Sequence, residues 1–162
     1  AVPFPRITLA DAIDIVKARG HEIQRGGDMD PEGERQIAAH VFENYGHEFV
    51  FLTDYPSTVR PFYHMRHADN DALTNSYDLI WRGTEITTGA QREHRVDVLI
   101  EQIKSKGLEP EGLQSYIDFF RFGAPAHGGF GMGLLRVIML LLHQPNIREV
   151  GYLFRGPNRL EP

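Results

Sequence analysis

The chain has 162 residues, of which 41% are hydrophobic and 24% charged, and its net charge is −5. These values are typical of one globular domain with its own core, and the acidic balance excludes a dominant basic surface for nucleic acid while leaving room for a local basic patch. Cysteine is absent, which excludes disulfides, thiol nucleophiles and cysteine-ligated zinc and fits a reducing compartment.

The first part of the chain predicts two helices. Thr8–Arg19 is the first, because Thr8 and Asp11 form a capping-box pattern ahead of apolar residues at helical spacing. The second begins at Pro31, a favoured first helical residue, and ends at Gly46. Ala1–Ile7 is predicted to be a loop. His21–Asp30 is predicted to be a loop or a short strand.

The middle of the chain changes to the alternating period of strands. Tyr77, Leu79 and Trp81 are expected to share one face of such a strand. The connections between the predicted strands are short, which implies antiparallel pairing. Four strands are predicted: Glu48–Tyr55, Pro61–Met65, Thr74–Arg82 and Glu85–Thr88.

The last part of the chain predicts helices again. Two amphipathic helices are expected over Arg95–Lys106 and Pro110–Arg121, and a third, apolar helix ends near His143. A final strand is expected at Glu149–Phe154. The predicted fold class is therefore α+β, an antiparallel sheet flanked by helices, with a long buried helix against it. No signal peptide or membrane-spanning run is visible.

A glycine-rich segment precedes the apolar helix and predicts a turn that leads into the helix N-terminus. The free N–H groups there, together with Arg136 one turn later, form a suitable site for phosphate. An equally good explanation is a buried pair between Arg136 and a carboxylate, because an unpaired charge in an apolar helix is costly. The glycines concerned are Gly128, Gly129, Gly131 and Gly133.

A second cluster with chemical potential lies in Glu85–Arg92. Glu85 and Thr88 offer oxygen ligands suited to Mg²⁺, and Arg92 offers a fork for a carboxylate. Residues three apart on a regular strand face opposite ways, so a shared site requires a bulge or helix start at Thr87–Gly89. On spacing alone, an edge strand with a solvated Glu–Arg pair is favoured.

A third group of polar residues resembles a metal site only superficially. Zinc sites in proteins have ligands at fixed spacings, and none is found here. A polar loop between strands is the favoured interpretation of His64, His67, Asp69 and Asp71.

Three segments, in order along the chain, together resemble a known family. They resemble the C-terminal half of the catalytic domain of aspartyl-tRNA synthetases, class II, of the archaeal and eukaryotic type, and the last resembles class II motif 3. The resemblance covers the whole chain. Its aspartyl character depends on Thr-Asp-Tyr-Pro and Gly-Ala-Gln-Arg, and asparaginyl enzymes are the near alternative. The segments are Thr53–Tyr63, Arg82–Arg92 and Gly123–Val137.

The resemblance implies roles for individual residues. Glu85 matches a glutamate that holds ATP and Mg²⁺, and Thr88 stands where the family usually has a serine that touches Mg²⁺ and aspartate. Arg92 matches the arginine that recognises aspartate. Arg136 matches the motif 3 arginine on the terminal phosphate and, with Glu85, is an expected catalytic residue; this strengthens the phosphate interpretation. The implied ATP-binding residues are Glu85, Gly133, Leu134, Leu135 and Arg136.

The resemblance further implies an ATP-dependent aspartate–tRNA ligase that forms aspartyl-adenylate and transfers the aspartyl group to tRNA. Residues 1–162 are expected to form a single domain, the C-terminal portion of the catalytic core without motifs 1 and 2. Catalysis by this portion alone is not expected. The expected ligands are aspartate, ATP, Mg²⁺ and tRNA, and the expected protein partner is an N-terminal half or a second copy in a homodimer. The expected location is the cytoplasm, and no membrane association is expected.

Two departures from the family pattern keep alternatives open. Leu135 replaces a common acidic residue, and Phe154–Pro157 differs from the usual Phe-Pro-Arg-Asp-Pro. One alternative is a paralogue that activates an amino acid for another reaction, such as amide formation. The other is a non-catalytic binding or regulatory module with the same fold.

Overall fold

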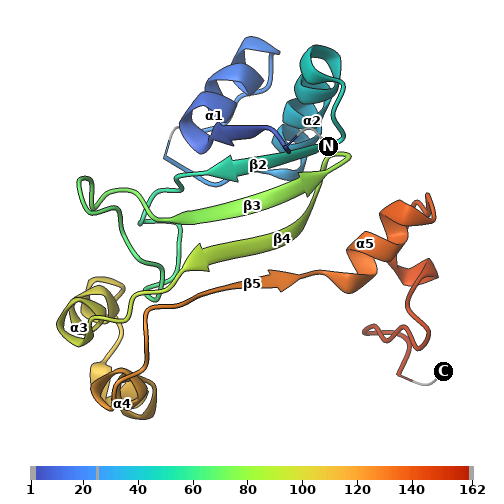
Figure 1. Cartoon of the computed structure of the whole chain (residues 1–162). Coiled ribbons are helices and arrows are strands. Elements are labelled where there is room, and N and C mark those ends of the chain that lie inside the picture. Colours follow the sequence, from blue (N-terminus) through green and yellow to red (C-terminus); the bar gives the residue numbers. More distant parts are fainter. Residues whose placement is uncertain (1–2, 25, 161–162) are drawn as a thin grey trace.

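A computed structural model describes residues 3–24 and 26–160. Within these residues, five strands form one sheet in the order β1-β2-β3-β4-β5, with helices on one face and at both ends (Figure 1). The strands are β1 (Arg6–Thr8), β2 (Phe49–Thr53), β3 (Ser76–Trp81), β4 (Thr84–Gln91) and β5 (Gly128–Met132). The helices are α1 (Leu9–Ala18), α2 (Pro31–Tyr45), α3 (Val96–Ser105), α4 (Gln114–Arg121) and α5 (Leu134–Leu141), with 3₁₀ turns at Pro110–Leu113 and Ile147–Glu149.

The first two helices confirm their sequence signals. The Thr8 hydroxyl caps α1 by accepting a hydrogen bond from the Asp11 backbone N–H at 3.1 Å. The Asp30 carboxylate caps α2 in the same way through the Gly33 N–H. Gly46 ends α2 in the left-handed conformation, with φ of 64°.

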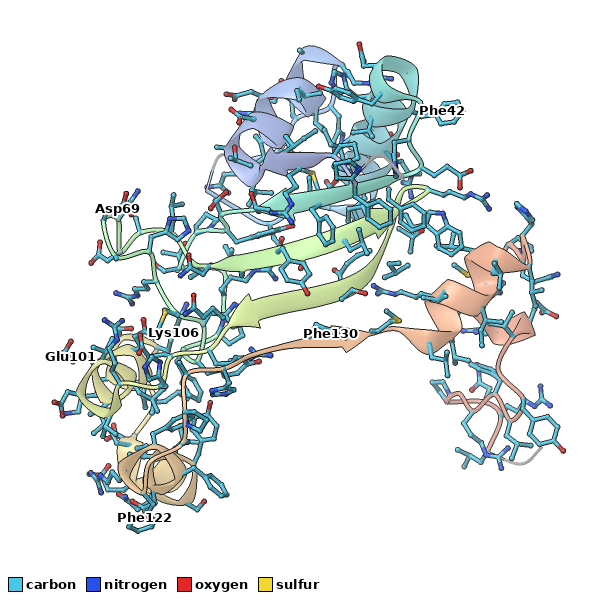
Figure 2. All side chains as sticks on the ribbon, in the orientation of Figure 1. Phe42, Asp69, Glu101, Lys106, Phe122 and Phe130 are labelled. Carbon is cyan, nitrogen blue, oxygen red and sulfur yellow. The ribbon has the colours of Figure 1, made fainter. Side chains whose placement is uncertain are left out.

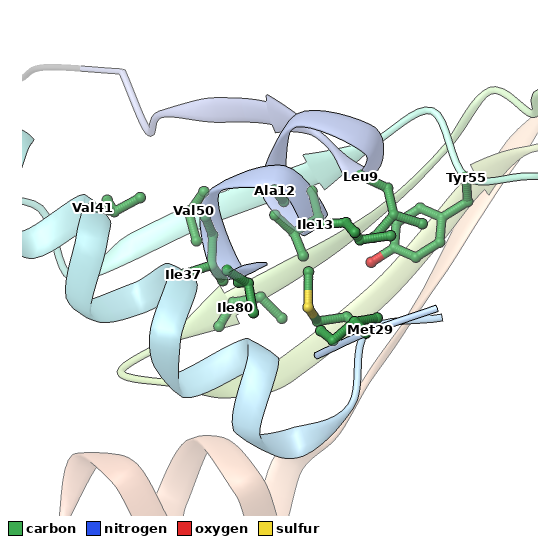
Figure 3. Packing of buried hydrophobic residues seen from close by; sticks show 12 residues of the cluster. Leu9, Ala12, Ile13, Met29, Ile37, Val41, Val50, Tyr55 and Ile80 are labelled. Carbon is green, nitrogen blue, oxygen red and sulfur yellow. The ribbon is translucent and has the colours of Figure 1, made fainter. Parts of the chain in front are cut away.

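The main core lies between α1, α2 and one face of the sheet (Figure 3). Alternation along the strands directs Val50 and Leu52 of β2 and Ile80 of β3 into it. A second core between α3 and α4 contains Leu99, Ile103, Ile117 and Phe120. The other buried hydrophobic residues of the main core are Leu9, Ala12, Ile13, Val16, Ile23, Met29, Ile37, Val41 and Tyr55.

The alternation in β3 is confirmed, but its buried face is not the more apolar one. Ser76, Asp78 and Ile80 are buried beneath the helices, whereas Tyr77 and Leu79 are only half-buried. The opposite face of the sheet carries stacked aromatic rings instead. Phe49 stacks on Trp81, with ring centroids 5.1 Å apart, and Phe51 meets Tyr77 edge-on at 5.3 Å.

Three predictions about strands are wrong. Arg6–Thr8, predicted mostly as loop, pairs in parallel with β2, so the sheet is mixed rather than purely antiparallel. Pro61–Met65 contains no strand, because the His64 N–H closes a turn onto the Pro61 carbonyl. Residues 149–154 form no strand either, because Glu149 ends a 3₁₀ turn that the Asn146 side chain caps.

The glycine-rich segment is a strand rather than a turn. Gly128–Met132 pairs with β4 in antiparallel register, from Gln91↔Gly128 to Thr87↔Met132. The helix that follows is found as predicted, but its predicted burial is wrong: none of its residues is buried. The residues of α5 are not buried because the helix lies beyond the end of β5 and not against a face of the sheet (Figure 1). No helix within the described ranges has the length and hydropathy to cross a membrane.

Candidate functional site

A β-bulge in β4 brings two predicted ligands to one face. Leu79 of β3 pairs with Thr87, but the next residue, Ile80, pairs with Glu85, so Ile86 is an extra residue in β4. Glu85 and Thr88 consequently lie on the same side, and the Thr88 hydroxyl donates to Glu85 Oε1 at 2.9 Å. A bulge is therefore present, but at Ile86, just before the Thr87–Gly89 segment where the sequence required it.

Arg136 of α5 reaches the same carboxylate. Its Nη1 donates to the Glu85 backbone carbonyl at 2.8 Å and lies 3.7 Å from Glu85 Oε1. Arg136 therefore has a carboxylate partner, Glu85, as one interpretation of the sequence expected. The pair is not buried, however, because the Arg136 side chain is 47% exposed. No further hydrogen bond engages the Arg136 guanidinium within residues 3–24 and 26–160, so its other donors can meet an anion.

The start of α5 is attached to the bulge. The Gly133 N–H donates to the Ile86 carbonyl at 2.9 Å, and Gly133 is the N-cap of α5 without a side-chain capping bond. Leu134 and Leu135 follow with exposed side chains. The other four residues predicted to bind ATP thus begin directly beside Glu85, the fifth.

Glu34 belongs to this group and was missed by sequence reasoning. Its Oε2 accepts the Glu85 backbone N–H at 2.8 Å from the first turn of α2. Burial raises the pKa of the Glu34 carboxyl, and the nearby Glu85 charge adds to that rise. No local pattern connects two residues that lie 51 positions apart.

Arg60 and Asp78 form a buried pair beside the site, which sequence reasoning also missed. Arg60 Nη2 lies 2.6 Å from Asp78 Oδ2, and both side chains are under one-tenth exposed. The Arg60 guanidinium stacks on Tyr55, 3.6 Å from the ring centroid. Asp78 is paired with Thr88 across β3 and β4, so this ion pair borders the Glu85–Thr88 face.

Arg92 is held against an aromatic ring just after β4. Its guanidinium carbon lies 4.7 Å from the centroid of the Tyr63 ring, and a Cβ on Gly129 would lie 3.7 Å from its Nε. Arg92 Nη1 is buried and has no hydrogen-bond partner in the described ranges. A buried, unsatisfied guanidinium donor is costly, which makes Arg92 a candidate for binding a carboxylate.

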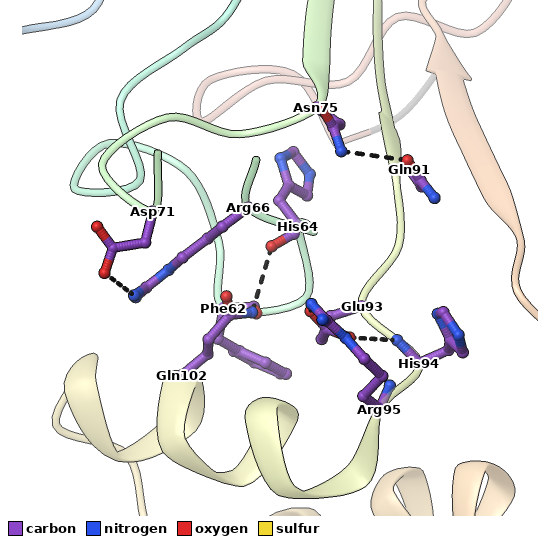
Figure 4. A network of polar contacts seen from close by, with 10 residues as sticks. All are labelled: Phe62, His64, Arg66, Asp71, Asn75, Gln91, Glu93, His94, Arg95 and Gln102. Atoms are coloured by element: carbon purple, nitrogen blue, oxygen red, sulfur yellow. Dashed lines mark hydrogen bonds and ion pairs between the residues drawn. The ribbon is translucent and has the colours of Figure 1, made fainter. Parts of the chain in front are cut away.

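Figure 4 shows a polar network that includes Glu93, His94 and Arg95, the segment that follows Arg92 in the chain. The Glu93 carboxylate is fully buried and accepts hydrogen bonds from Arg95 and from the His94 N–H. Burial alone would raise the pKa of Glu93, but the hydrogen bonds and charge of Arg95 outweigh it and lower that pKa. Gln102 of α3 donates to the carbonyls of Phe62 and His64.

The donor set around Glu85 fits a hard cation that keeps other ligands. One carboxylate and one hydroxyl, 2.9 Å apart, suit Mg²⁺, which retains waters and phosphate oxygens. Among residues 3–24 and 26–160, no cluster of three histidine or acidic residues is arranged to bind a metal. His67 instead lies 3.1 Å from Asp54, which agrees with the loop interpretation of that segment.

Comparisons with known proteins agree on one family. Residues 1–155 match the family model described as tRNA synthetases class II (D, K and N). The chain is 47% identical over 160 residues to an aspartate–tRNA(Asp) ligase of Pyrococcus abyssi, covering 99% of this chain and 36% of that protein. It also superposes on an aspartyl-tRNA synthetase from Entamoeba histolytica, with TM-score 0.94 and 41% identity over 99% of this chain and 33% of that one. Asparaginyl-tRNA synthetase from Pyrococcus horikoshii gives TM-score 0.89 at 31% identity, over 99% of this chain and 37% of that one. The chain therefore spans little more than a third of the length of these proteins.

Proposed function

The chain belongs to the class II tRNA synthetases (D, K and N), and on that premise we propose that it is the motif 3 part of an aspartate–tRNA ligase. The aspartate assignment is supported by 47% identity to an aspartate ligase against 31% to an asparaginyl enzyme. Residues 1–162 form the C-terminal portion of the catalytic core in this proposal, and the cytoplasm is the proposed location.

The observation that carries the proposal is the convergence of two side chains, Thr88 and Arg136, on the Glu85 carboxylate. Thr88 donates to the Glu85 carboxylate, and Arg136 from another element lies beside it, half-exposed. Two oxygen ligands and a fixed cation together form a half-site for a nucleotide phosphate and its metal. Leu134 and Leu135 add backbone N–H groups at the start of α5, which the Gly133 N–H attaches to the Ile86 carbonyl.

The proposed reaction joins aspartate to ATP. The substrate α-carboxylate attacks the α-phosphorus, and aspartyl-adenylate and pyrophosphate result; the aspartyl group then passes to the 3′ end of tRNA. Arg136 holds the terminal phosphate, and the buried, unpaired donor of Arg92 binds the carboxylate that identifies aspartate. Glu85 and Thr88 hold Mg²⁺, which when bound neutralises charge on phosphate oxygens. Catalysis by these residues is positioning and charge neutralisation.

One sequence feature favours a second function. Leu135 stands where the family commonly has an acidic residue, which favours a paralogue that activates an amino acid for a reaction other than tRNA charging. Formation of adenylate without transfer to tRNA, measured on the full-length protein, would identify that paralogue.

Calorimetric titration of the chain with ATP·Mg²⁺, with and without aspartate, tests the proposal. Glu85→Ala and Arg136→Ala each remove a charged contact, so we expect affinity to fall about tenfold or more. Arg121→Ala is the matched control, because among the described residues the Arg121 side chain pairs only with Asp118, on the surface of α4. Unchanged affinity in both site variants would contradict the proposed phosphate and metal roles.

A further inference from the structure

A hollow at the other end of the sheet from α5 is lined by cations and hydroxyl groups. Its volume is about 420 Å³, and it lies between the turn after Tyr55, the loop before β3 and the end of α3. Lys106 marks it in Figure 2, between the loop that carries Asp69 and helix α3. The Arg66–Lys106 hollow is lined by Ser57, Thr58, Arg66, Ser105 and Lys106.

Lys106 is held in place by neutral groups rather than by an acid. Its Nζ donates to the backbone carbonyls of Ser57 and Thr58 at 2.7 and 2.8 Å. An ammonium group has three protons, so one donor remains. No carboxylate forms an ion pair with Lys106 in the part of the chain that the structure describes. The two carbonyls therefore fix the position of Lys106 without neutralising its charge.

Arg66 adds a second positive charge with weak compensation. Its Nη1 lies 4.0 Å from Asp71 Oδ2, the outer limit of an ion pair, and the Asp71 side chain is 87% exposed. Burial lowers the pKa of Lys106, and the charge of Arg66 lowers it further. The two cations therefore repel each other across the hollow, and an anion between them would relieve that repulsion.

We propose that the Arg66–Lys106 hollow binds a phosphate group. Arg66 supplies forked donors, Lys106 supplies a point charge, and the hydroxyls of Ser57 and Thr58 supply further donors, a set suited to a tetrahedral anion with several oxygens. The Ser105 hydroxyl already donates to the Gln102 carbonyl and is not counted as a donor. The phosphate is a backbone phosphodiester of RNA or a free phosphate, since both present the same oxygens.

This site is independent of the proposed ATP site. Its residues come from other segments than Glu85 and Arg136, and α5 lies at the opposite end of the sheet (Figure 2). A chain that does not bind ATP would therefore not contradict the phosphate site, and a chain that does not bind phosphate in the hollow would not contradict the ATP site.

NMR titration of backbone amide resonances, with inorganic phosphate and separately with a short RNA duplex, tests the proposal. We expect shifts in the segments that line the hollow, and an affinity loss of about fivefold or more in Arg66→Gln and Lys106→Gln. For RNA, each variant should also reduce the dependence of log affinity on log salt by about 0.9. Lys104→Gln, on the same helix but outside the hollow, should bind as the wild type does. Asp71→Asn should strengthen binding, because it frees Arg66.

The outcomes separate the two sources. If both probes bind, and both bind more weakly to Arg66→Gln and Lys106→Gln, the ligand is an RNA backbone phosphate. If inorganic phosphate binds but the RNA duplex does not, the ligand is a free phosphate. Absence of binding to the wild-type chain, or equal losses in Lys104→Gln and the hollow variants, overturns the proposal. If the Lys106→Gln variant unfolds because it loses the two carbonyl contacts, phosphate binding by Arg66→Gln and Asp71→Asn tests the proposal instead.

Discussion

Single side chains near Arg92 have their protonation set by burial. His64 is only 3% exposed, and its backbone pairs with that of Arg92. Burial, with the charges of Arg92 and Arg60, lowers the pKa of His64 to about 4. His64 is therefore neutral at pH 7 and adds no charge to the proposed aspartate site.

The buried His64 predicts a pH dependence of stability. An unfolded imidazole has a pKa near 6.5, so the unfolded state binds a proton between about pH 6.5 and 4 that the folded state does not. Stability from neutral His64 is complete above about pH 6.5 and falls by up to about 3 kcal/mol as the pH approaches 4. Urea unfolding from pH 4 to 7 should show a steeper loss in the wild type than in His64→Gln. Parallel pH profiles would contradict the prediction.

At the scale of elements, β4 carries the site and depends on close packing with β3. Gly89 pairs with Tyr77, and a Cβ at Gly89 would lie 2.4 Å from Tyr77 Cζ. That separation is far inside van der Waals contact, so the aromatic ring occupies the space that any other residue at this position would need. The strand that presents Glu85 and Thr88, and that ends just before Arg92, is therefore positioned in part by one glycine.

Gly89→Ala is expected to lower the free energy of unfolding by about 1–3 kcal/mol, because Tyr77 must move. Removal of the ring in the double variant with Tyr77→Ala should make the combined loss smaller than the sum of the single losses. Gly112→Ala is the control, since its Cβ would meet nothing within 4 Å. Urea titrations of the four variants measure these differences, and additive losses would exclude the clash.

At the scale of the whole molecule, apolar surface gathers on β5 and α5. Phe130 is 64% exposed, Leu134 66% and Leu141 62%, although the main core and the α3–α4 core are well buried. Contiguous exposed apolar surface favours association in water. The described part of the chain thus has two buried cores, whereas the apolar residues of β5 and α5 remain in contact with solvent.

We expect the 162-residue chain to self-associate as its concentration rises. The double variant Leu134→Gln and Leu141→Gln should stay monomeric over the same range, because it removes apolar area without opening a core. Leu108→Gln changes a separate exposed leucine at the end of α3 and serves as the control. Sedimentation velocity distinguishes these cases, and equal association in all three proteins would rule out α5 as the cause.

Much of this molecule follows from local signals in the sequence. Thr8 and Asp30 mark the starts of α1 and α2, because capping is an interaction between residues three apart. The resemblance to class II synthetases pointed to Glu85, Thr88, Arg92 and Arg136 as site residues. The structure brings Glu85, Thr88 and Arg136 together, and the roles of all four residues are proposals.

Tertiary structure alone decided the features that depend on distant neighbours. The extra residue Ile86, which brings Glu85 and Thr88 to one face, exists because β3 pairs with β4 in two registers. Glu34 reaches Glu85 only through the packing of α2 on the sheet. An apolar pattern predicts burial, but α5 stays exposed because it lies beyond the end of the sheet. Helix caps are local in the sequence, whereas strand register and burial depend on which segments the fold brings together.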